Sequence, residues 1–444
     1  MKTTLNPDFV KHIHHRLASD NAQAAKPGPS DRRQPVHTVY GGAHLFSERT
    51  IRRLGEMARQ AFTSYAPDAI TLCRALGLDY SQEQAQRLHD KVGQKLASEA
   101  VEDFRIDFED GFGNRPDEEE DATAIKAAQA LAHAMQSNDL SPFIGIRIKP
   151  FNDELKARSI RTLDLFLSTL IGKTKQLPDG FTVTLPKITH PGQVTALAEI
   201  MDTMEPMLGL QNGALCMELM VETPESIFDQ QGACALPTLV TNARGRCRGA
   251  HFGTYDYTAS MDITAAWQSM DHPACDFARH VMKVTLAGTG VLISDGATNV
   301  MPVGPHRSEQ LTNTQLQENQ DVVHAAWKLA FDHTRHSLRH GIYQGWDLHP
   351  AQFVARYAAV FSFFLESKDA ATTRLRNFMD TAAKATLSGD VFDDAATGQG
   401  LLNFFLRAFG CGAIDADELL ATGLSEEEFR TRSFLKILQM RRTL

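Results

Sequence analysis

Glu222 lies at an abrupt change in the character of the sequence. The run ALCMELMVE (214–222) is apolar enough to predict a buried strand, and Thr223-Pro224 directly after it predicts the start of a helix. A carboxylate at this junction can complement the helix N-terminus, which is its structural interpretation. It is also placed to bind a metal ion or a substrate where the strand ends.

Polar residues that could do chemistry follow other strand-like runs in the same way. Two carboxylates from neighbouring strands, together with water, make an oxygen-only site that suits Mg²⁺. A nearby arginine offers a planar fork that matches a substrate carboxylate. A metal ion and an arginine could therefore hold a 2-oxo or 2-hydroxy acid and stabilise its enolate. In chain order, the residues at these run ends are His44, Asp107, Glu109, Asp110, Arg147, Lys187, Glu222, Asp256, Asp295, Asp347 and His349.

Several of these residues also have a structural interpretation. Asp256 could be a loop or N-cap residue after the turn at 253–255. Arg147 could pair with Asp107 or Glu109 in the interior of a barrel. The functional interpretation rests on the convergence of these residues at the ends of the strand-like runs.

The chain alternates β-rich segments with helical patterns, which is typical of a parallel sheet. Most gaps leave room for a loop, a helix and a return loop. Eight such units close into an α/β fold, the (β/α)8 TIM barrel, whose chemistry gathers at the carboxyl ends of the strands. The expected strands lie within residues 36–46, 101–110, 142–150, 180–188, 214–222, 247–256, 289–296 and 341–350.

Two stretches go beyond a plain barrel. Residues 47–100 hold two helical patterns, each opened by a serine, and predict a helical insertion after the first strand. Residues 356–444 predict a helical C-terminal extension, long enough to cover the barrel mouth or to build a subunit interface. The expected domains are therefore a lead-in over 1–35, a catalytic barrel over 36–355 that contains the insertion, and the extension.

Composition narrows the class of protein. With 444 residues, 43% hydrophobic and 22% charged, the chain has an ordinary globular balance. A net charge of -9 argues against a nucleic-acid partner. The six cysteines form no CxxC pair, which favours buried free thiols in a reducing compartment. The N-terminus lacks an apolar signal core and no run reaches about 18 apolar residues, so we expect a cytoplasmic protein without a membrane partner.

Five motifs occur in order along the expected barrel: IDFEDGF (106–112), GIRIKPF (145–151), VETPESI (221–227), HFGTYDYTASMDI (251–263) and GWDLHPAQF (345–353). Together they resemble the HpcH/HpaI aldolase and citrate lyase β-subunit family, a branch of the phosphoenolpyruvate/pyruvate barrels. The corresponding family segments read DLEDSV, RVN, IETPxGI, FGxxDLxxxLG and GxxxIHPxQ. Each motif is loose alone, whereas the ordered set is specific.

The resemblance implies roles for five residues. Glu222 and Asp256 match the two metal ligands, and Arg147 matches the arginine that binds the substrate carboxylate. Asp107 and Glu109 match the acidic pair beside the metal, acting through water or by orienting Arg147.

Two further residues are assigned to substrate binding. His44 follows the first strand, where it could also act as an acid or a base or have a structural role. Asp347 belongs to the last of the five motifs.

The chemistry that the resemblance implies is reversible carbon–carbon cleavage of a small 2-oxo or hydroxy acid through a metal-stabilised enolate. It implies Mg²⁺, or Mn²⁺, as the cofactor and a homo-oligomer, a trimer or a hexamer. The first strand, VHTVYGGAHLF, lacks the arginine and the proline of the family's RSxLFVPG segment, which argues against a coenzyme A substrate. Two alternatives stay open: phosphoryl transfer, for which Lys149 and Lys187 are the obvious strand-end lysines, and a barrel that binds without catalysis.

Overall fold

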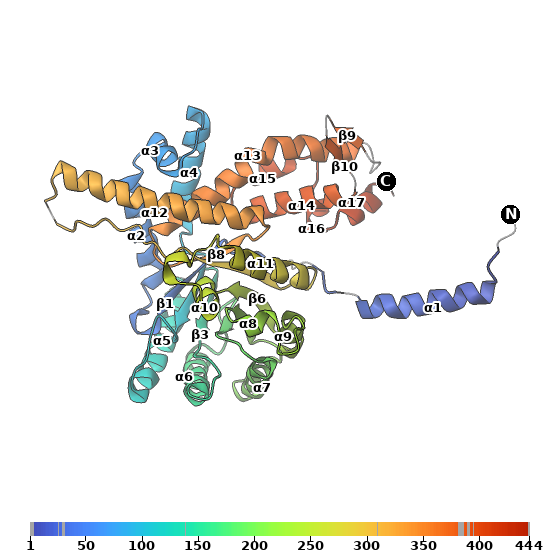
Figure 1. Cartoon of the computed structure of the whole chain (residues 1–444), viewed down its shortest axis with the longest axis horizontal. Coiled ribbons are helices and arrows are strands. Elements are labelled where there is room, and N and C mark those ends of the chain that lie inside the picture. The colour runs from blue at the N-terminus through green and yellow to red at the C-terminus, as the bar shows by residue number, and fades with distance from the viewer. Residues whose placement is uncertain are drawn as a thin grey trace.

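Each strand of the central sheet pairs in parallel with the next, and β8 pairs back with β1, so that the sheet closes into a barrel (Figure 1). The structure, a computed structural model, describes residues 4–24, 26–28, 32–137, 139–308, 310–380, 386–388, 391–393 and 395–442. The predicted α/β TIM barrel is confirmed, and each strand lies within or close to its expected run. The strands are β1 (His37–Gly42), β2 (Asp103–Asp107), β3 (Phe143–Arg147), β4 (Thr182–Leu185), β5 (Cys216–Val221), β6 (Cys247–Phe252), β7 (Leu292–Ala297) and β8 (Gln344–Asp347).

Helices connect successive strands and cover the outside of the barrel (Figure 1). Such crossovers are what parallel pairing requires, because a short hairpin joins only antiparallel strands. After β2 to β7, the connecting helices are α5 (Asp117–Ser137), α6 (Lys156–Thr174), α7 (Pro191–Met207), α8 (Pro224–Ile227), α9 (Leu236–Asn242), α10 (Thr254–Ser260), α11 (Pro273–Leu286) and α12 (Asn313–Arg339), with the short 3-10 turn η2 (Ala265–Trp267).

The insertion between β1 and β2 is helical as predicted, but it contains an additional helix. After the 3-10 turn η1 (Ala43–Leu45), the two predicted patterns form α2 (Thr50–Tyr65) and α4 (Gln82–Ser98). Between them lies α3 (Ala69–Leu76), which starts where the Asp68 side chain accepts the Thr71 N–H at 2.8 Å. It ends at Gly77, whose φ of 67° suits glycine.

The interior of the barrel is polar rather than aliphatic at mid-height. Arg105 of β2 crosses to β5, where its Nη2 lies 2.7 Å from Glu218 Oε1 and its Nε lies 3.0 Å from Oε2. Asp103 also pairs with Arg105, and Tyr40 lies above this layer with its hydroxyl 3.1 Å from His251 Nδ1. These buried charges compensate one another, as burial requires.

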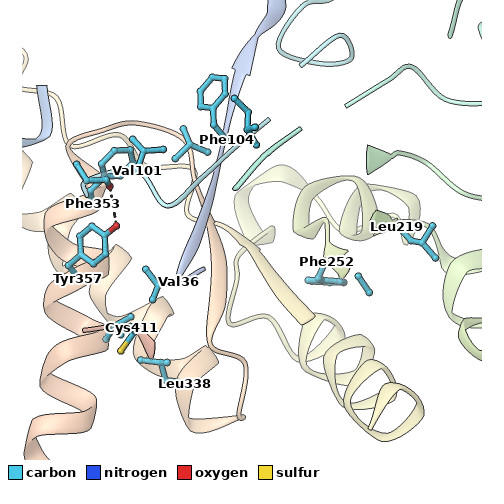
Figure 2. Packing of buried hydrophobic residues seen from close by; sticks show 14 of the residues in the cluster. Val36, Val101, Phe104, Leu219, Phe252, Leu338, Phe353, Tyr357 and Cys411 are labelled. Carbon is cyan, nitrogen blue, oxygen red and sulfur yellow. Dashed lines mark hydrogen bonds between the residues drawn. The ribbon is translucent and has the colours of Figure 1, made fainter. Parts of the chain in front are cut away.

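The apolar core lies between the outer face of the strands and the helices. In Figure 2, two residues of α13 (Gln352–Asp380), Phe353 and Tyr357, lie near Val101, which precedes β2. The Tyr357 hydroxyl donates 3.1 Å to the carbonyl of Ala100, which satisfies a buried polar group. This packing therefore fixes α13 against the segment that leads into β2, the strand that carries Asp107.

The C-terminal extension packs at the amino ends of the strands. Beyond α13 it contains a small hairpin and further helices: β9 (Thr386–Ser388), β10 (Val391–Asp393), α14 (Ala395–Gly410), α15 (Ala416–Leu420), α16 (Glu426–Arg430) and α17 (Phe434–Arg442). Arg407 lies over the ring of Tyr343 at 5.0 Å and bonds Gln34, and these two partners precede β8 and β1. Cys411 joins the same core, near Val36 (Figure 2). The expectation that the extension covers the barrel mouth is therefore wrong, because it packs at the opposite end; a subunit interface stays a prediction.

The predicted lead-in contains one helix, α1 (Pro7–Ala24), which projects away from the barrel in the view of Figure 1. None of the helices in the described ranges combines the length and the apolar character needed to cross a bilayer. The cysteines are free and mostly buried, as predicted.

Candidate active site

Five of the predicted site residues meet at the carboxyl ends of the strands, and one of them, Glu109, lies in the loop after β2. Asp107 and Arg147 are the last residues of β2 and β3 and are partners in the strand register. Glu222 directly follows β5, and Asp256 lies in the first turn of α10, which follows β6. Because parallel strands all end on one side of a barrel, these side chains share its mouth.

Arg147 is buried and paired on several sides. Its Nε and Nη2 donate to the two oxygens of Asp107 at 2.7 and 2.6 Å, a bidentate pair. Its Nη1 lies 3.0 Å from Glu109 Oε2, outside good hydrogen-bond geometry. The guanidinium also stacks over the rings of Tyr40 and Trp346, at 4.8 and 5.5 Å. Asp107 thus occupies the fork of Arg147, and Nη1 is left without a hydrogen bond.

The ammonium group of Lys187 lies among the carboxylates of the mouth. Its Nζ is 2.6 Å from Glu109 Oε1, 3.1 Å from Asp256 Oδ2 and 3.3 Å from Asp110 Oδ2. Burial alone would lower the pKa of Lys187, but Glu222 and Glu109 outweigh it and raise that pKa above its ordinary value. Lys187 therefore stays a cation and links strand ends that are far apart in sequence.

Glu222 is held rigidly at the end of β5. Its Oε1 accepts the main-chain N–H of Lys187 at 2.7 Å, and only 1% of the residue is exposed. A Cβ at Gly253 would lie 2.5 Å from both Cβ and Oε2 of Glu222, so only glycine allows this close approach. Burial, partly offset by Lys187 and reinforced by Asp256, raises the pKa of Glu222 to about 8. A carboxylate in this position favours a positive partner.

The donor atoms of the mouth fit a hard cation such as Mg²⁺, which takes oxygen ligands and keeps several waters. Glu109 Oε2 is buried without a hydrogen-bond partner, so the mouth has acceptor capacity to spare. Within the described ranges, no three carboxylate oxygens here come within 4.8 Å of one another. Lys187 lies between Glu109 and Asp256 and accounts for their separation. The residues therefore suit an ion held by one or two carboxylates and completed by water or substrate.

Asp347 does not join this group. It is the last residue of β8, but its side chain points outward from the barrel, where Oδ1 accepts from Arg356 Nη2 at 2.8 Å and Oδ2 lies 2.8 Å from His37 Nδ1. Burial would raise the pKa of Asp347, yet Arg356 and His37 outweigh it and lower that pKa to about 2. The substrate-binding role predicted for Asp347 is therefore corrected to a structural ion pair: strand alternation turns this residue away from the mouth.

His44 lies at the rim of the mouth rather than at its centre. It belongs to η1 after β1, and its ring packs 5.7 Å from that of Phe112 in the loop after β2. Partial burial, followed by the nearby Arg115, lowers the pKa of His44. Its Nδ1 is buried without a hydrogen-bond partner. A substrate contact for His44 stays a prediction.

Sequence reasoning missed three features of the mouth. It considered Lys187 only as a phosphate ligand, whereas the side chain neutralises carboxylates. It gave no role to the aromatic pair Tyr40 and Trp346, whose rings lie 4.3 Å apart under Arg147. It did not use Gly253, although a glycine between a buried strand and an acidic turn is a signal of close backbone approach.

The closed barrel, with carboxylates and an arginine at its strand ends, places the chain among the α/β barrel proteins. A comparison with known proteins identifies its family. A family model described as a domain of unknown function, DUF6986, matches residues 16–437. The chain belongs to this family. No curated protein sequence matches it significantly.

Solved structures share the architecture. A citrate lyase from Burkholderia xenovorans is 18% identical, with a TM-score of 0.56 over 88% of this chain and 97% of that chain. A malate synthase from Haloferax volcanii is 14% identical, with a TM-score of 0.46 over 93% and 99% of the two chains. The CitE protein of Mycobacterium tuberculosis, solved with magnesium, acetoacetate and coenzyme A, is 15% identical, with a TM-score of 0.45 over 84% and 97%. The resemblance drawn from the five motifs is thus confirmed in the fold, which the chain shares with the citrate lyase.

Proposed function

We propose that this protein is a Mg²⁺-dependent carbon–carbon lyase that cleaves or forms a small 2-oxo or hydroxy carboxylic acid. The observation that carries the proposal is the position of Arg147 beside the carboxylates that surround Lys187, all at the carboxyl ends of the strands. The fold shared with a citrate lyase supports the same class of reaction.

In this proposal, Glu222 and Asp256 hold the metal ion. Bound there, Mg²⁺ supplies positive charge next to the substrate oxygen on which negative charge develops. Lys187 has to move away from Asp256 to admit the ion, since its ammonium lies 3.1 Å from that carboxylate. The hydrogen bond from the Lys187 main chain keeps Glu222 Oε1 in place during this change, because it does not involve the side chain that moves.

Arg147 binds the substrate carboxylate through Nη1. Asp107 fixes the other two nitrogens, and Glu109 lies within 3.0 Å of Nη1, so both acids act as positioning residues for the arginine. The rings of Tyr40 and Trp346 support its flat face and exclude water from that side. The arginine is therefore preorganised, which lowers the cost of binding a small acid.

Phosphoryl transfer is less well supported, because both lysines that would have to bind the phosphate group are already engaged by protein oxygens. Lys149 Nζ donates 2.8 Å to the carbonyl of Phe108 and lies 3.4 Å from Glu120 in a buried position. Lys187 is engaged by carboxylates, which repel a phosphate. The geometry thus favours a ligand that brings a cation over one that brings several negative charges.

A turnover screen tests the proposal. Purified protein is incubated with Mg²⁺ and a panel of 2-oxo and hydroxy acids, with matching coenzyme A thioesters as a separate arm, and carbon–carbon cleavage is followed by product analysis. We expect cleavage of at least one free acid that stops with EDTA and in Glu222→Gln. Binding of acids without turnover would identify a non-catalytic barrel, and turnover only with phosphate donors would establish the phosphoryl-transfer alternative.

A further inference from the structure

A second group of metal-ligand side chains lies outside the barrel, between α11 and α12. Asp276 and His280 are four residues apart on α11, and His336 and His340 are four residues apart at the end of α12. This spacing places each pair on one face of its helix. The two faces meet, because His336 Nε2 lies 2.7 Å from Asp276 Oδ1.

Three of these side chains converge on one point. One ligand atom from each of Asp276, His336 and His340 lies within 4.8 Å of the other two, and in the described part of the chain no other group of three meets this condition. The rings of His336 and His340 are 4.4 Å apart. Ligand atoms around a tetrahedral zinc ion lie about 3.3 Å apart, given metal–ligand bonds of about 2.0–2.2 Å. Small side-chain rotations would bring the three ligand atoms from within 4.8 Å of one another to the spacing that zinc requires.

Hydrogen bonds prepare these ligands. His340 Nδ1 lies 2.9 Å from the carbonyl of His336, and since a carbonyl only accepts, Nδ1 carries the proton and Nε2 keeps its lone pair in the neutral ring. Asp276 is oriented by Arg279 at 2.6 Å, and Arg279 is anchored 3.0 Å from Asp295 of β7. Partners of this kind fix the orientation of metal ligands.

The donor set separates this group from the barrel mouth. Two imidazoles and one carboxylate suit zinc and similar transition-metal ions, whereas the mouth offers oxygen atoms alone. About a quarter of the Asp276 and His336 side chains is exposed, 27% and 28%, so an ion can enter from solvent. A hydrogen bond between His336 and Asp276 explains their contact, but it does not explain why a third ligand converges with its tautomer already set.

We propose that Asp276, His336 and His340 bind a zinc-class dication, with water completing its coordination. The ion joins the first turn of α11 to the last turn of α12, and it replaces the proton that His336 shares with Asp276. The site is independent of the proposed lyase activity, since none of its ligands lies at the mouth.

Titration of the full-length, untagged chain tests this site. Metal-free protein is saturated with Mg²⁺, which occupies oxygen sites, and Zn²⁺ binding is measured by calorimetry. Co²⁺ is then used as a spectroscopic probe of the same site. We expect one Zn²⁺ per chain, a rise in melting temperature on binding, and Co²⁺ absorption bands typical of nitrogen and oxygen ligands without a thiolate charge-transfer band. His336→Ala and His340→Gln should weaken Zn²⁺ binding by at least about tenfold.

The matched control is His133→Ala, which removes an exposed histidine of α5 and should leave binding unchanged. Circular dichroism and gel filtration of each variant show that the fold persists. Unchanged Zn²⁺ affinity in both cluster variants, absence of Zn²⁺ binding in the wild type, or a cobalt–thiolate band would each overturn the proposal. None of these readouts depends on turnover, so a failure of the lyase assignment leaves the result intact.

Discussion

The main-chain nitrogen of Lys187 donates a hydrogen bond of 2.7 Å to Oε1 of Glu222, and this bond ties the end of β4 to the end of β5. Lys187 adopts a left-handed backbone with a φ of 49°, which costs a non-glycine residue free energy. The strained turn directs the N–H to one carboxylate and the ammonium to others. In the proposed function, one residue therefore both positions Glu222 and has to give way to the metal ion.

The first prediction concerns Glu222. Glu222→Gln keeps the shape of the side chain and removes the carboxylate that would bind the ion, so we expect Mg²⁺ affinity to fall by at least about a hundredfold. The melting temperature should stay the same or rise, because a buried carboxyl is replaced. Calorimetric titration with Mg²⁺ measures the effect. Glu225→Gln, at an exposed position three residues on, is the control. Equal affinities in the two variants would exclude Glu222 as a ligand.

Gly253 gives a steric test of the same contact. In Gly253→Ala the new Cβ would lie 2.5 Å from Glu222, so Glu222 must shift, and we expect weaker Mg²⁺ binding together with a loss of about 1–3 kcal/mol in the free energy of unfolding. Denaturant unfolding and metal titration measure both. Gly172→Ala in α6, where a Cβ meets nothing within 4 Å, should instead stabilise by about 0.5–1 kcal/mol. A Gly253→Ala protein with wild-type stability and affinity would show that the contact is not needed.

Removal of the Lys187 ammonium should strengthen metal binding. Lys187→Met eliminates a cation 3.1 Å from Asp256 and keeps the main-chain bond to Glu222, so we expect Mg²⁺ affinity to rise by about tenfold or more. Lys187→Arg keeps the charge and should show little or no gain. The comparison uses metal titration at low ionic strength, where screening is weak. Weaker binding in Lys187→Met would mean that Lys187 supports the metal site rather than competes for it.

Asp347 should make stability depend on acid pH. Its pKa of about 2 in the folded protein lies below the ordinary value of 3.8, so its contribution is present above pH 3.8 and is lost as the pH falls toward 2. The expected contribution is on the order of 2 kcal/mol. Asp347→Asn should be less stable at neutral pH and lose less on acidification, as measured by denaturant unfolding at several pH values. Asp79→Asn, at an exposed position, is the control.

A different outcome would restore the earlier assignment of Asp347. If Asp347→Asn left stability unchanged at every pH and raised the KM for the substrate, the residue would belong to the substrate site despite its ion pair with Arg356.

The architecture could be read from the sequence because its signals are local. Alternating apolar runs and helical patterns follow from burial and periodicity, and all eight strands are visible in this way. The short helix α3 was missed because its eight residues are too few for a periodic pattern to stand out. The position of the C-terminal extension could not be read, because an excess of apolar residues shows that a helix is covered but not by which surface.

The acidic residues of the candidate site could be predicted from the sequence, whereas the side chains that pair with them could be predicted less well. Glu222, Asp256, Arg147 and Asp107 stand out by their place at the ends of strand-like runs. Asp347 stands at a run end as well, yet it faces α13, because a shift of one position along a strand reverses the face to which a side chain points. Whether the fork of Arg147 is open to a substrate likewise depends on whether a neighbouring acid reaches it. That is a matter of side-chain geometry, and here Asp107 accepts from two of its nitrogens.

The join between β1 and β8 has a consequence for the order of folding. His37 and Asp347 are separated by 310 residues, and both strands are needed before either has its full set of partners. During synthesis, β1 cannot pair with β8 until nearly four-fifths of the chain has left the ribosome, so the barrel cannot close before then. Until then, one edge of β1 remains unpaired, and an open edge is a site for misassociation with other chains. Within the helical insertion that follows β1, α3 and α4 can pair early, whereas the packing of the insertion against α12 and α13 must also wait for the end of the barrel.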